Sequence, residues 1–220
     1  AFASAPDFET QQSYVLVVTA SDTNATNTTT QEITVNLTNV NDIAPVITSA
    51  DAFSVAEGTD AVATLSGSDA EGDSVSFSTI LAGTDAVNFT LSSSGALAFA
   101  ATPDFEAAAD ADANNVYSIT ATITDGTNTS TQAITITVTD TNDSTPVLTV
   151  NTPYSVAEGT TSVGTVTAAD ADANSTITYT LSGTDAADFD INSASGAISF
   201  VLAPDFETPG SVAGTNAYSL

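Results

Sequence analysis

Apolar and polar residues alternate along much of the chain, and this alternation is clearest in two long runs. In the first run, Ile134, Ile136 and Val138 are separated by threonines, and residues 117–123 follow the same two-residue spacing. A period of two with many β-branched residues predicts half-buried β-strands. Shorter apolar segments with this spacing lie at 53–55, 62–65, 75–77, 89–91 and 97–99. No stretch shows the 3.6-residue apolar spacing of an amphipathic helix, so we predict an all-β protein.

The sequence repeats itself with a period close to 100 residues. Pro-Asp-Phe-Glu occurs at 6–9, 103–106 and 204–207, and the segment 54–59 returns 101 residues later at 155–160. This period is the length of a small domain rather than of a solenoid repeat. About seven strands in about 100 residues are typical of an Ig-like Greek-key β-sandwich. We therefore predict tandem seven-stranded sandwiches in an elongated array.

The repeat also divides the chain into three parts. We expect the C-terminal part of one repeat at 1–47, a complete repeat at 48–148 and the N-terminal part of a third repeat at 149–220. Adjacent repeats of the same polypeptide are then the first partners of each sandwich.

Charge narrows the range of functions. The 220 residues include 27 Asp and Glu but no Lys, Arg, His or Cys, so the formal net charge is −27. A chain without cationic side chains cannot neutralise nucleic-acid phosphates or an anionic membrane surface. Catalysis by a His base or a Cys nucleophile is excluded as well. The chain is nevertheless 42% hydrophobic, which is too apolar for a disordered acidic tail, and no run is long enough to insert into a membrane.

The acids gather where predicted strands end. Glu57 follows one strand, Asp69 and Glu71 precede another, and Asp125 and Asp140 follow two more. Loops at one end of a sandwich converge, so these carboxylates would repel one another unless a cation neutralised them. Calcium accepts six to eight oxygen ligands in a tolerant geometry, whereas magnesium requires a tighter octahedron. We therefore predict Ca²⁺ sites.

Motifs of this chain, taken together, resemble those of cadherin repeats. The resemblance rests on Ala56-Glu57, Asp69-Ala70-Glu71, Asp104-Phe105-Glu106 and the segment Asp140 to Pro146, which occur in the order and spacing of that family. It covers the whole sequence. The absence of basic residues, Cys and Trp makes the chain more similar to a cadherin-like repeat of a large bacterial surface protein than to an animal cadherin.

The resemblance implies calcium at each junction between repeats. At the first junction it implies the ligands Asp7, Glu9, Asn41, Asp42, Asp69, Glu71 and Asp125. At the second junction it implies Glu57, Asp104, Glu106, Asp140, Asn142, Asp143, Asp170 and Asp172. Glu158, Asp205 and Glu207 would serve a further junction.

Some positions depart from the family pattern. Asn39 stands where the linker of the family begins with an Asp, so we expect weaker calcium binding at the first junction than at the second. Asp85, Asp185 and Asp188 lie outside the motifs and are expected to be surface loop acids.

These features favour a calcium-stiffened segment of an extracellular fibre or cell-surface adhesin, without enzymatic activity. Identical subunits in a filament, or homophilic contacts, are further expected partners, and neighbouring subunits could complete each other by strand addition. An alternative is a glycan-binding sandwich in which calcium bridges sugar hydroxyls. A glycoside hydrolase with paired carboxylates is disfavoured, because the same acids recur in every repeat instead of forming one site.

Overall fold

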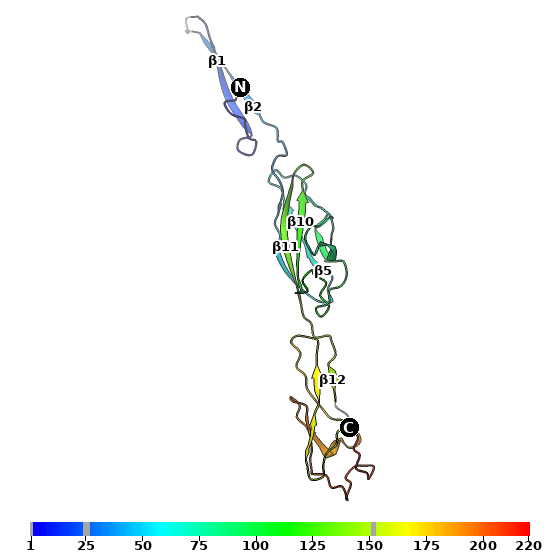
Figure 1. Ribbon diagram of the computed structural model, residues 1–220. Helices are drawn as coiled ribbons and strands as arrows, with labels where there is room; N and C mark the ends of the chain where they lie inside the picture. Colours follow the sequence, from blue (N-terminus) through cyan, green and yellow to red (C-terminus); the bar gives the residue numbers. More distant parts are fainter. Residues whose placement is uncertain (1, 24–26, 151–152) are drawn as a thin grey trace. The chain divides into compact units, whose positions relative to one another are not determined.

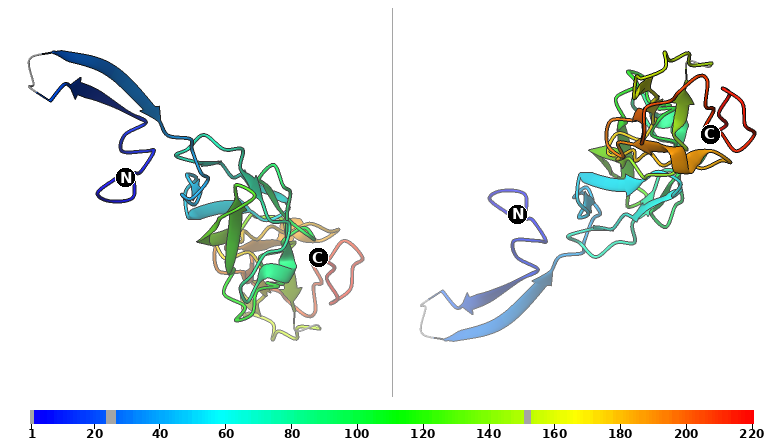
Figure 2. Two further views of the ribbon diagram at one scale, coloured as in Figure 1. Left: turned by 90° about the horizontal axis from the view of Figure 1, so that it is seen from above. Right: turned by 90° about the horizontal axis from the view of Figure 1, so that it is seen from below.

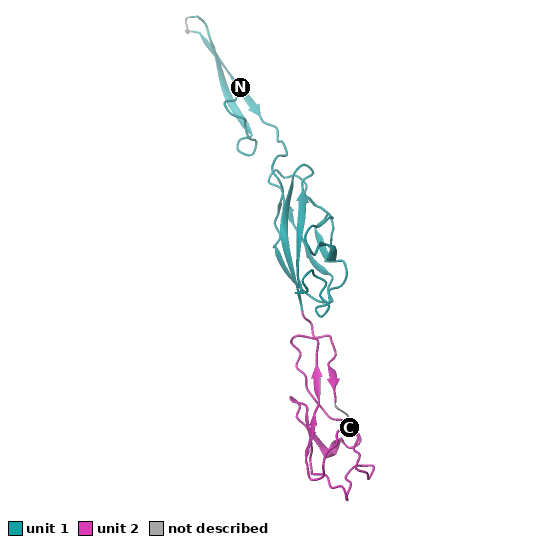
Figure 3. Ribbon diagram, viewed as in Figure 1, with its two compact units in different colours: residues 1–139 teal, residues 140–220 magenta. Residues whose placement is uncertain are grey.

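The computed structural model describes residues 2–23, 27–150 and 153–220, and the chain is almost entirely β-strand and loop (Figure 1). It forms two compact units, residues 1–139 and residues 140–220 (Figure 3). Unit 1 contains a two-stranded hairpin and the sheets of the middle repeat, and unit 2 contains the sheets of the third repeat. No helix among the described residues has the length and hydropathy of a membrane span.

The first sheet of the middle repeat is built on its two longest strands. β10 (Val116–Thr124) and β11 (Thr129–Thr139) pair antiparallel with Ile119 opposite Ile134, so the isoleucines of both strands enter the core while the threonines alternate with them. β4 (Ala52–Ala56) runs parallel to β11, and β7 (Ser76–Phe77) pairs with β10. The resulting order is β4-β11-β10-β7.

A second sheet covers the apolar face of the first. It has the order β5-β9-β8, from β5 (Ala61–Thr64), β9 (Ala96–Phe99) and β8 (Phe89–Leu91). The rings of Phe89, Phe99 and Tyr117 meet in the core with centroids 4.5–5.5 Å apart, two of the three pairs edge to face. The predicted all-β sandwich is therefore confirmed.

The middle repeat contains two short strands that the sequence does not indicate, β3 (Val46–Ile47) and β6 (Gly67–Ser68). β3 pairs with β6, whereas β4, which follows β3 in the chain, pairs with β11. The chain thus leaves one sheet and enters the other between Ile47 and Ala52. The expected boundaries at residues 47 and 148 fall inside β3 and β12 (Val147–Thr149), and both strands pair within the repeat that follows them.

The hairpin of unit 1 has no further strand beside it in the part of the chain that the structure describes (Figure 2). Its strands, β1 (Ser13–Ser21) and β2 (Thr28–Asn36), pair antiparallel along their whole length. Apolar side chains on both faces are exposed, including Leu16, Val17 and Ile33.

Unit 2 repeats the first half of the middle sandwich. β12 pairs with β14 (Thr167–Ala169), and a three-stranded sheet has the order β13-β16-β15, from β13 (Ser162–Thr165), β16 (Ala197–Phe200) and β15 (Phe189–Ile191). Short 3₁₀ helices precede β8 and β15, at Ala86–Asn88 (η1) and Ala186–Asp188 (η2).

Asp85 and Asp185 are not the surface loop acids expected from the sequence, because both are only 4% exposed. The two carboxylate oxygens of Asp85 accept hydrogen bonds from the backbone N–H groups of Ala111 and Ser118, both at 2.8 Å. Asp185 makes the equivalent bonds to Val212 and Ser219, both at 2.7 Å. The Asp85 carboxylate thus ties a long loop to the start of β10, and Asp185 joins residues 212 and 219 of unit 2 in the same way.

We predict that Asp85→Ala lowers the free energy of unfolding of the middle repeat by about 2–4 kcal/mol, because two buried backbone donors lose a charged acceptor. Asp85→Asn should cost less, since its amide oxygen still accepts. Urea unfolding would measure both, with the exposed Asp60→Ala as a matched control. Equal stabilities of Asp85→Ala and Asp60→Ala would contradict this role.

Candidate metal centre

The three Pro-Asp-Phe-Glu segments form the same kind of turn. Asp7 Oδ1 accepts hydrogen bonds from the N–H groups of Glu9 and Thr10, at 3.0 and 3.3 Å, and Asp205 Oδ1 does the same for Glu207 and Thr208, at 3.0 and 3.2 Å. Asp104 accepts from the N–H of Ala107 at 3.0 Å. An Asp that bonds to the backbone two or three residues later fixes a tight turn, which holds the following Glu in a repeated position.

A second Glu is held against this turn in both later repeats. Glu57 Oε2 accepts the N–H of Phe105 at 2.6 Å, and Glu158 Oε2 accepts the N–H of Phe206 at 3.0 Å. Glu57 is only 7% exposed. In both repeats, a hydrogen bond between residues 48 positions apart thus joins the Ala-Glu-Gly segment to the Pro-Asp-Phe-Glu turn.

The first-junction cluster consists of Glu9, Asp42 and Glu71, three predicted ligands that the structure brings together within unit 1. One carboxylate oxygen of each lies within 4.8 Å of one oxygen of each of the others. Glu71 is oriented by its Oε2, which accepts the linker N–H groups of Asp42 and Ile43 at 3.0 and 2.8 Å. The turn of the first repeat, the linker and a loop of the middle repeat therefore meet at one point.

Two oxygens at this cluster have no hydrogen-bond donor in the part of the chain that the structure describes. Asp69 Oδ2 and Glu71 Oε1 are both buried and unpartnered, while Asp69 Oδ1 accepts the N–H of Glu71 at 2.7 Å. Buried carboxylate oxygens are normally hydrogen-bonded or bound to a metal. Asp73 lies in the same loop, with an oxygen within 4.8 Å of Asp69 and Glu71. Sequence analysis missed Asp73, although the alternating acids at 69, 71 and 73 were a visible signal.

The surroundings of Glu9 raise the pKa of its carboxyl. Its own backbone N–H lowers the pKa of the Glu9 carboxyl, but the pKa is raised overall by desolvation, by the Asp7 carboxyl and by the charges of Glu71 and Asp42. Like charges held close together disfavour the ionised form. The cluster therefore repels its own negative charge.

Asn41 and Asp125, both predicted ligands, are joined by a residue that sequence analysis missed. The side-chain amide of Asn128 donates to Asn41 Oδ1 at 2.6 Å and to Asp125 Oδ2 at 3.2 Å, and the carbonyl oxygen of Ile43 lies 3.5 Å from the same nitrogen. Asn27 donates to Asp22 in the same way at 2.8 Å, one repeat earlier. The recurrence of Asn 101 residues apart was the signal that could have identified Asn128.

The surroundings of Asp125 lower the pKa of its carboxyl, which favours the ionised form. Desolvation raises the pKa of its carboxyl, but the backbone N–H groups of Asn128 and Thr127 and the amides of Asn128 and Asn41 lower it, and the net shift is downward. Donors that bond to the charged form favour it. Asp7, by contrast, has both oxygens engaged in its own turn, with Thr10 bonded to each of them.

The ligands expected at the second junction are divided between the two units. In unit 1, Glu57 and Asp104 are fixed by the turn described above, and Glu106 is exposed. In unit 2, Asp172 is 5% exposed and accepts the linker N–H of Ser144 at 3.1 Å, as Glu71 does for Ile43.

The linker acid Asp140 is anchored within unit 2. Its Oδ2 accepts the N–H of Ala173 at 2.9 Å, while its Oδ1 has no hydrogen-bond partner among the described residues. Asp170 accepts the N–H of Asp172 at 3.2 Å, and Asn142 and Asp143 are exposed. Asp140 and Asp172 thus bring the linker and the loop of the third repeat together.

Glu158, Asp205 and Glu207 form a further group in unit 2, with oxygens within 4.8 Å of one another. The sequence had assigned these three residues to a junction beyond the second. Their grouping shows that the pairing of Glu with the turn is a property of each repeat and needs no neighbouring repeat.

The donor atoms of the first-junction cluster suit a hard divalent cation. They are all oxygens, and the sequence has no Lys, Arg or His to neutralise them. Glu71 Oε1 and the neighbouring Asp69 Oδ2 are buried without a hydrogen-bond partner among the described residues. Oxygen-only sites with several carboxylates are typical of calcium, which tolerates the irregular geometry of a loop cluster. The residues therefore fit the metal that the sequence predicts.

Comparison of sequences gives one family for the middle of the chain. The sequence model of the family described as "Bacterial Ig domain" matches residues 41–139. These residues run from the linker before the middle repeat to the end of β11. No curated protein sequence matches the chain.

Comparison of structures gives cadherin repeats. A protocadherin gammaB7 structure of repeats EC3–6, described as a cis-dimer, superposes with a TM-score of 0.71 at 22% identity, over 90% of this chain and 54% of that one. Mouse cadherin-23 EC22–24 gives 0.63 at 21% identity, over 93% and 68%.

A third match is human protocadherin-24 EC1–2, with a TM-score of 0.60 at 21% identity over 74% of this chain and 79% of that one. The chain spans 35–54% of the length of three matching protocadherin gamma structures. The chain therefore has the fold of tandem cadherin-like β-sandwich repeats, with a middle repeat that matches the bacterial Ig domain family.

Proposed function

We propose that this chain is a structural or adhesive segment of an extracellular protein, and that calcium bound at the junctions between its repeats makes it rigid. The observation that carries the proposal is the first-junction cluster, in which Glu9, Asp42 and Glu71 converge from three distant segments. Two carboxylate oxygens beside them have no hydrogen-bond partner among the described residues. Bound calcium would supply the positive charge that this cluster lacks.

The chain's own residues determine what an ion does at the first junction. Glu9 belongs to the turn of the first repeat, Asp42 to the linker, and Asp69 and Glu71 to the middle repeat. An ion held by all of them connects two repeats directly, so their relative rotation would break oxygen ligands. Asn41 and Asp125 adjoin the same linker through Asn128 and would extend the site.

We propose the same arrangement at the second junction. Its ligands would be Glu57, Asp104 and Glu106 from the middle repeat, Asp140, Asn142 and Asp143 from the linker, and Asp170 and Asp172 from the third repeat. Two hydrogen bonds that recur along the chain support this. The Phe N–H of the Pro-Asp-Phe-Glu turn donates to a Glu carboxylate in the middle and third repeats. A linker N–H donates to an acid of the following loop at both linkers.

Several further features support an extracellular, non-enzymatic role. The fold is shared with cadherin extracellular repeats, and the family that matches the middle repeat is bacterial, which favours a fibre or adhesin on a bacterial surface. Calcium concentrations outside cells suit sites of modest affinity. Recurrence of the acids in every repeat favours a series of joints over a single active site. We propose three repeats with boundaries near residues 47 and 148, placed a few residues earlier than expected so that β3 and β12 belong to the repeats in which they pair.

The first test replaces one charge in the cluster. Glu71→Gln keeps an oxygen that can accept the N–H groups of Asp42 and Ile43, but it removes the negative charge, so we expect calcium affinity at the first junction to fall by about tenfold or more. Calorimetric titration would measure the loss, and Glu32→Gln on exposed β2 is the matched control. Unchanged binding by Glu71→Gln would contradict the proposed site.

The second test exchanges the residues that distinguish the two linkers. Asn39 occupies the position of Asp140, so Asn39→Asp should strengthen calcium binding at the first junction by about tenfold, and Asp140→Asn should weaken the second by a similar factor. Asn36→Asp adds the same charge on exposed β2 and should leave affinity nearly unchanged. A gain in affinity from Asn36→Asp equal to that from Asn39→Asp would show that only net charge matters.

A further inference from the structure

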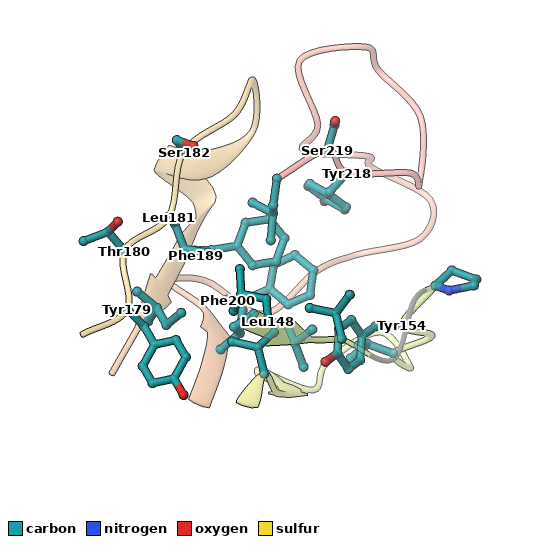
Figure 4. Close-up of a pocket in the computed structure, with 18 of the residues that line it drawn as sticks. Leu148, Tyr154, Tyr179, Thr180, Leu181, Ser182, Phe189, Phe200, Tyr218 and Ser219 are labelled. Atoms are coloured by element: carbon teal, nitrogen blue, oxygen red, sulfur yellow. The ribbon is translucent and has the colours of Figure 1, made fainter. Parts of the chain in front are cut away.

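Unit 2 contains an open apolar cavity of about 1190 Å³, whose lining includes the rings of Phe189, Phe200 and Tyr218 (Figure 4). These rings pack with centroids 4.3–5.5 Å apart, as do their counterparts in the core of the middle repeat, Phe89, Phe99 and Tyr117. The cavity therefore belongs to the core of the third repeat and not to a ligand site. The polar group that points to a further property lies in unit 1, at the linker before the middle repeat.

Four oxygen atoms surround the side-chain amide nitrogen of Asn128, in the turn between β10 and β11. This nitrogen lies 2.6 Å from Asn41 Oδ1 and 3.2 Å from Asp125 Oδ2. The backbone carbonyl oxygens of Asn41 and Ile43 lie 3.4 and 3.5 Å from it. A side-chain amide has two hydrogens to donate. The oxygens thus offer more acceptors at one point than the amide can satisfy.

The same four oxygens suit a hard cation. They are one carboxylate oxygen, one amide oxygen and two backbone carbonyl oxygens, all of which are typical calcium ligands. Asn41 and Asp125 are also among the ligands expected at the first junction. A cation bound by these oxygens and the amide nitrogen of Asn128 cannot both lie at the point where the oxygens converge.

Other hydrogen bonds position these oxygens without the Asn128 side chain. Asp125 Oδ1 accepts two backbone N–H groups of its own turn, at 2.6 and 2.7 Å. On the linker side, Glu71 Oε2 accepts the N–H groups of Asp42 and Ile43. The turn and the linker are therefore both held in place when the amide is removed, and the amide is not the support on which a cation site would depend.

We propose that the Asn128 amide is an internal competitor for calcium at the first junction. It bonds the linker to Asp125, and calcium must displace it to reach the same oxygens. An intramolecular group that occupies the binding-competent oxygens lowers the apparent affinity for the ion by the fraction of molecules in which those oxygens are free. The amide thereby raises the calcium concentration at which the junction becomes rigid. This inference rests on the proposed calcium site and adds the group that the ion displaces.

Asn128→Ala removes the amide and keeps the backbone bonds of the turn. Calcium titration followed by NMR, at the backbone N–H signals of Asp42 and Ile43, would measure affinity at this junction separately from the others. We expect binding about five- to tenfold tighter than in the parent chain, because the ion no longer competes with the amide hydrogen bonds. A residue that only positioned ligands would give the opposite result, since its loss would weaken binding.

Asn114→Ala is the matched control. The Asn114 amide also donates to a carboxylate, Asp112 Oδ2 at 2.8 Å, but in an exposed loop that contains none of the first-junction ligands. This variant should bind calcium at the first junction as the parent chain does. A gain in affinity equal to that of Asn128→Ala would show that the effect is not specific to the competing amide.

The same spectra recorded in EDTA test the amide without calcium. Asn41 is bonded to the Asn128 amide, whereas the N–H groups of Asp42 and Ile43 are bonded to Glu71. In Asn128→Ala we therefore expect the backbone order parameter of Asn41 to fall, and those of Asp42 and Ile43 to change little. An unchanged order parameter at Asn41 would overturn the inference, because the amide would then not hold the linker.

The calcium titration also separates this inference from the function on which it rests. If the parent chain binds calcium at the linker and Asn128→Ala binds it equally or more weakly, the competitor role is overturned and the junction site stands. If the linker signals of the parent chain do not respond to calcium, both the proposed function and this inference are contradicted. Tighter binding by Asn128→Ala, together with a more mobile Asn41 in EDTA, is the result that supports the competitor.

Discussion

Carboxylate oxygens are crowded together at the ends of these repeats in a chain that has no cationic side chain. At the first-junction cluster, one carboxylate oxygen each of Glu9, Asp42 and Glu71 lies within 4.8 Å of the others. The backbone N–H of Glu9 lowers the pKa of its carboxyl, but desolvation and the Asp7 carboxyl raise it, and the charges of Glu71 and Asp42 add smaller contributions in the same direction. A protein with Lys or Arg could relieve such repulsion by ion pairs. This chain cannot, and that is the physical basis for proposing that an external cation stabilises the cluster.

The β-sandwich supplies the fixed positions that such a site needs. The Pro-Asp-Phe-Glu turn orients one Glu, and its Phe N–H binds a second Glu from the strand before it, as in Glu57 and Glu158. Backbone N–H groups of the linker orient the acids of the following loop, as in Glu71 and Asp172. The negative groups are thus placed by hydrogen bonds before any ion binds, which lowers the cost of ordering them.

Regular alternation and repetition made much of this structure predictable from the sequence. The isoleucines and threonines of β10 and β11 specify one buried face, and this prediction is confirmed because the two-residue alternation follows from local strand geometry. The resemblance to cadherin repeats implies that Glu9, Asp42 and Glu71 share one junction. The structure brings their oxygens within 4.8 Å, while their role as metal ligands stays a prediction.

Features that depend on tertiary contacts were not predictable in the same way. The sequence Gly-Thr-Asp indicates a surface loop at Asp85. The residue is buried because its carboxylate accepts hydrogen bonds from the N–H groups of Ala111 and Ser118, which lie 26 and 33 residues later in the chain. The sequence around Asn128 indicates only a turn, because its hydrogen bond to Asn41 depends on the tertiary contact between this turn and the linker. The short strand β3 has no alternating pattern of its own, and it forms because it pairs with β6, whereas β4 pairs with β11 in another sheet.

The central claim is that calcium converts flexible acidic joints into rigid ones, and small-angle X-ray scattering of the full chain in calcium and in EDTA tests it most directly. High salt should be held constant so that general charge repulsion is screened. The account predicts a single extended conformation with a sharply defined maximum dimension in calcium, and a broad range of dimensions in EDTA. Indistinguishable scattering in the two conditions would contradict it.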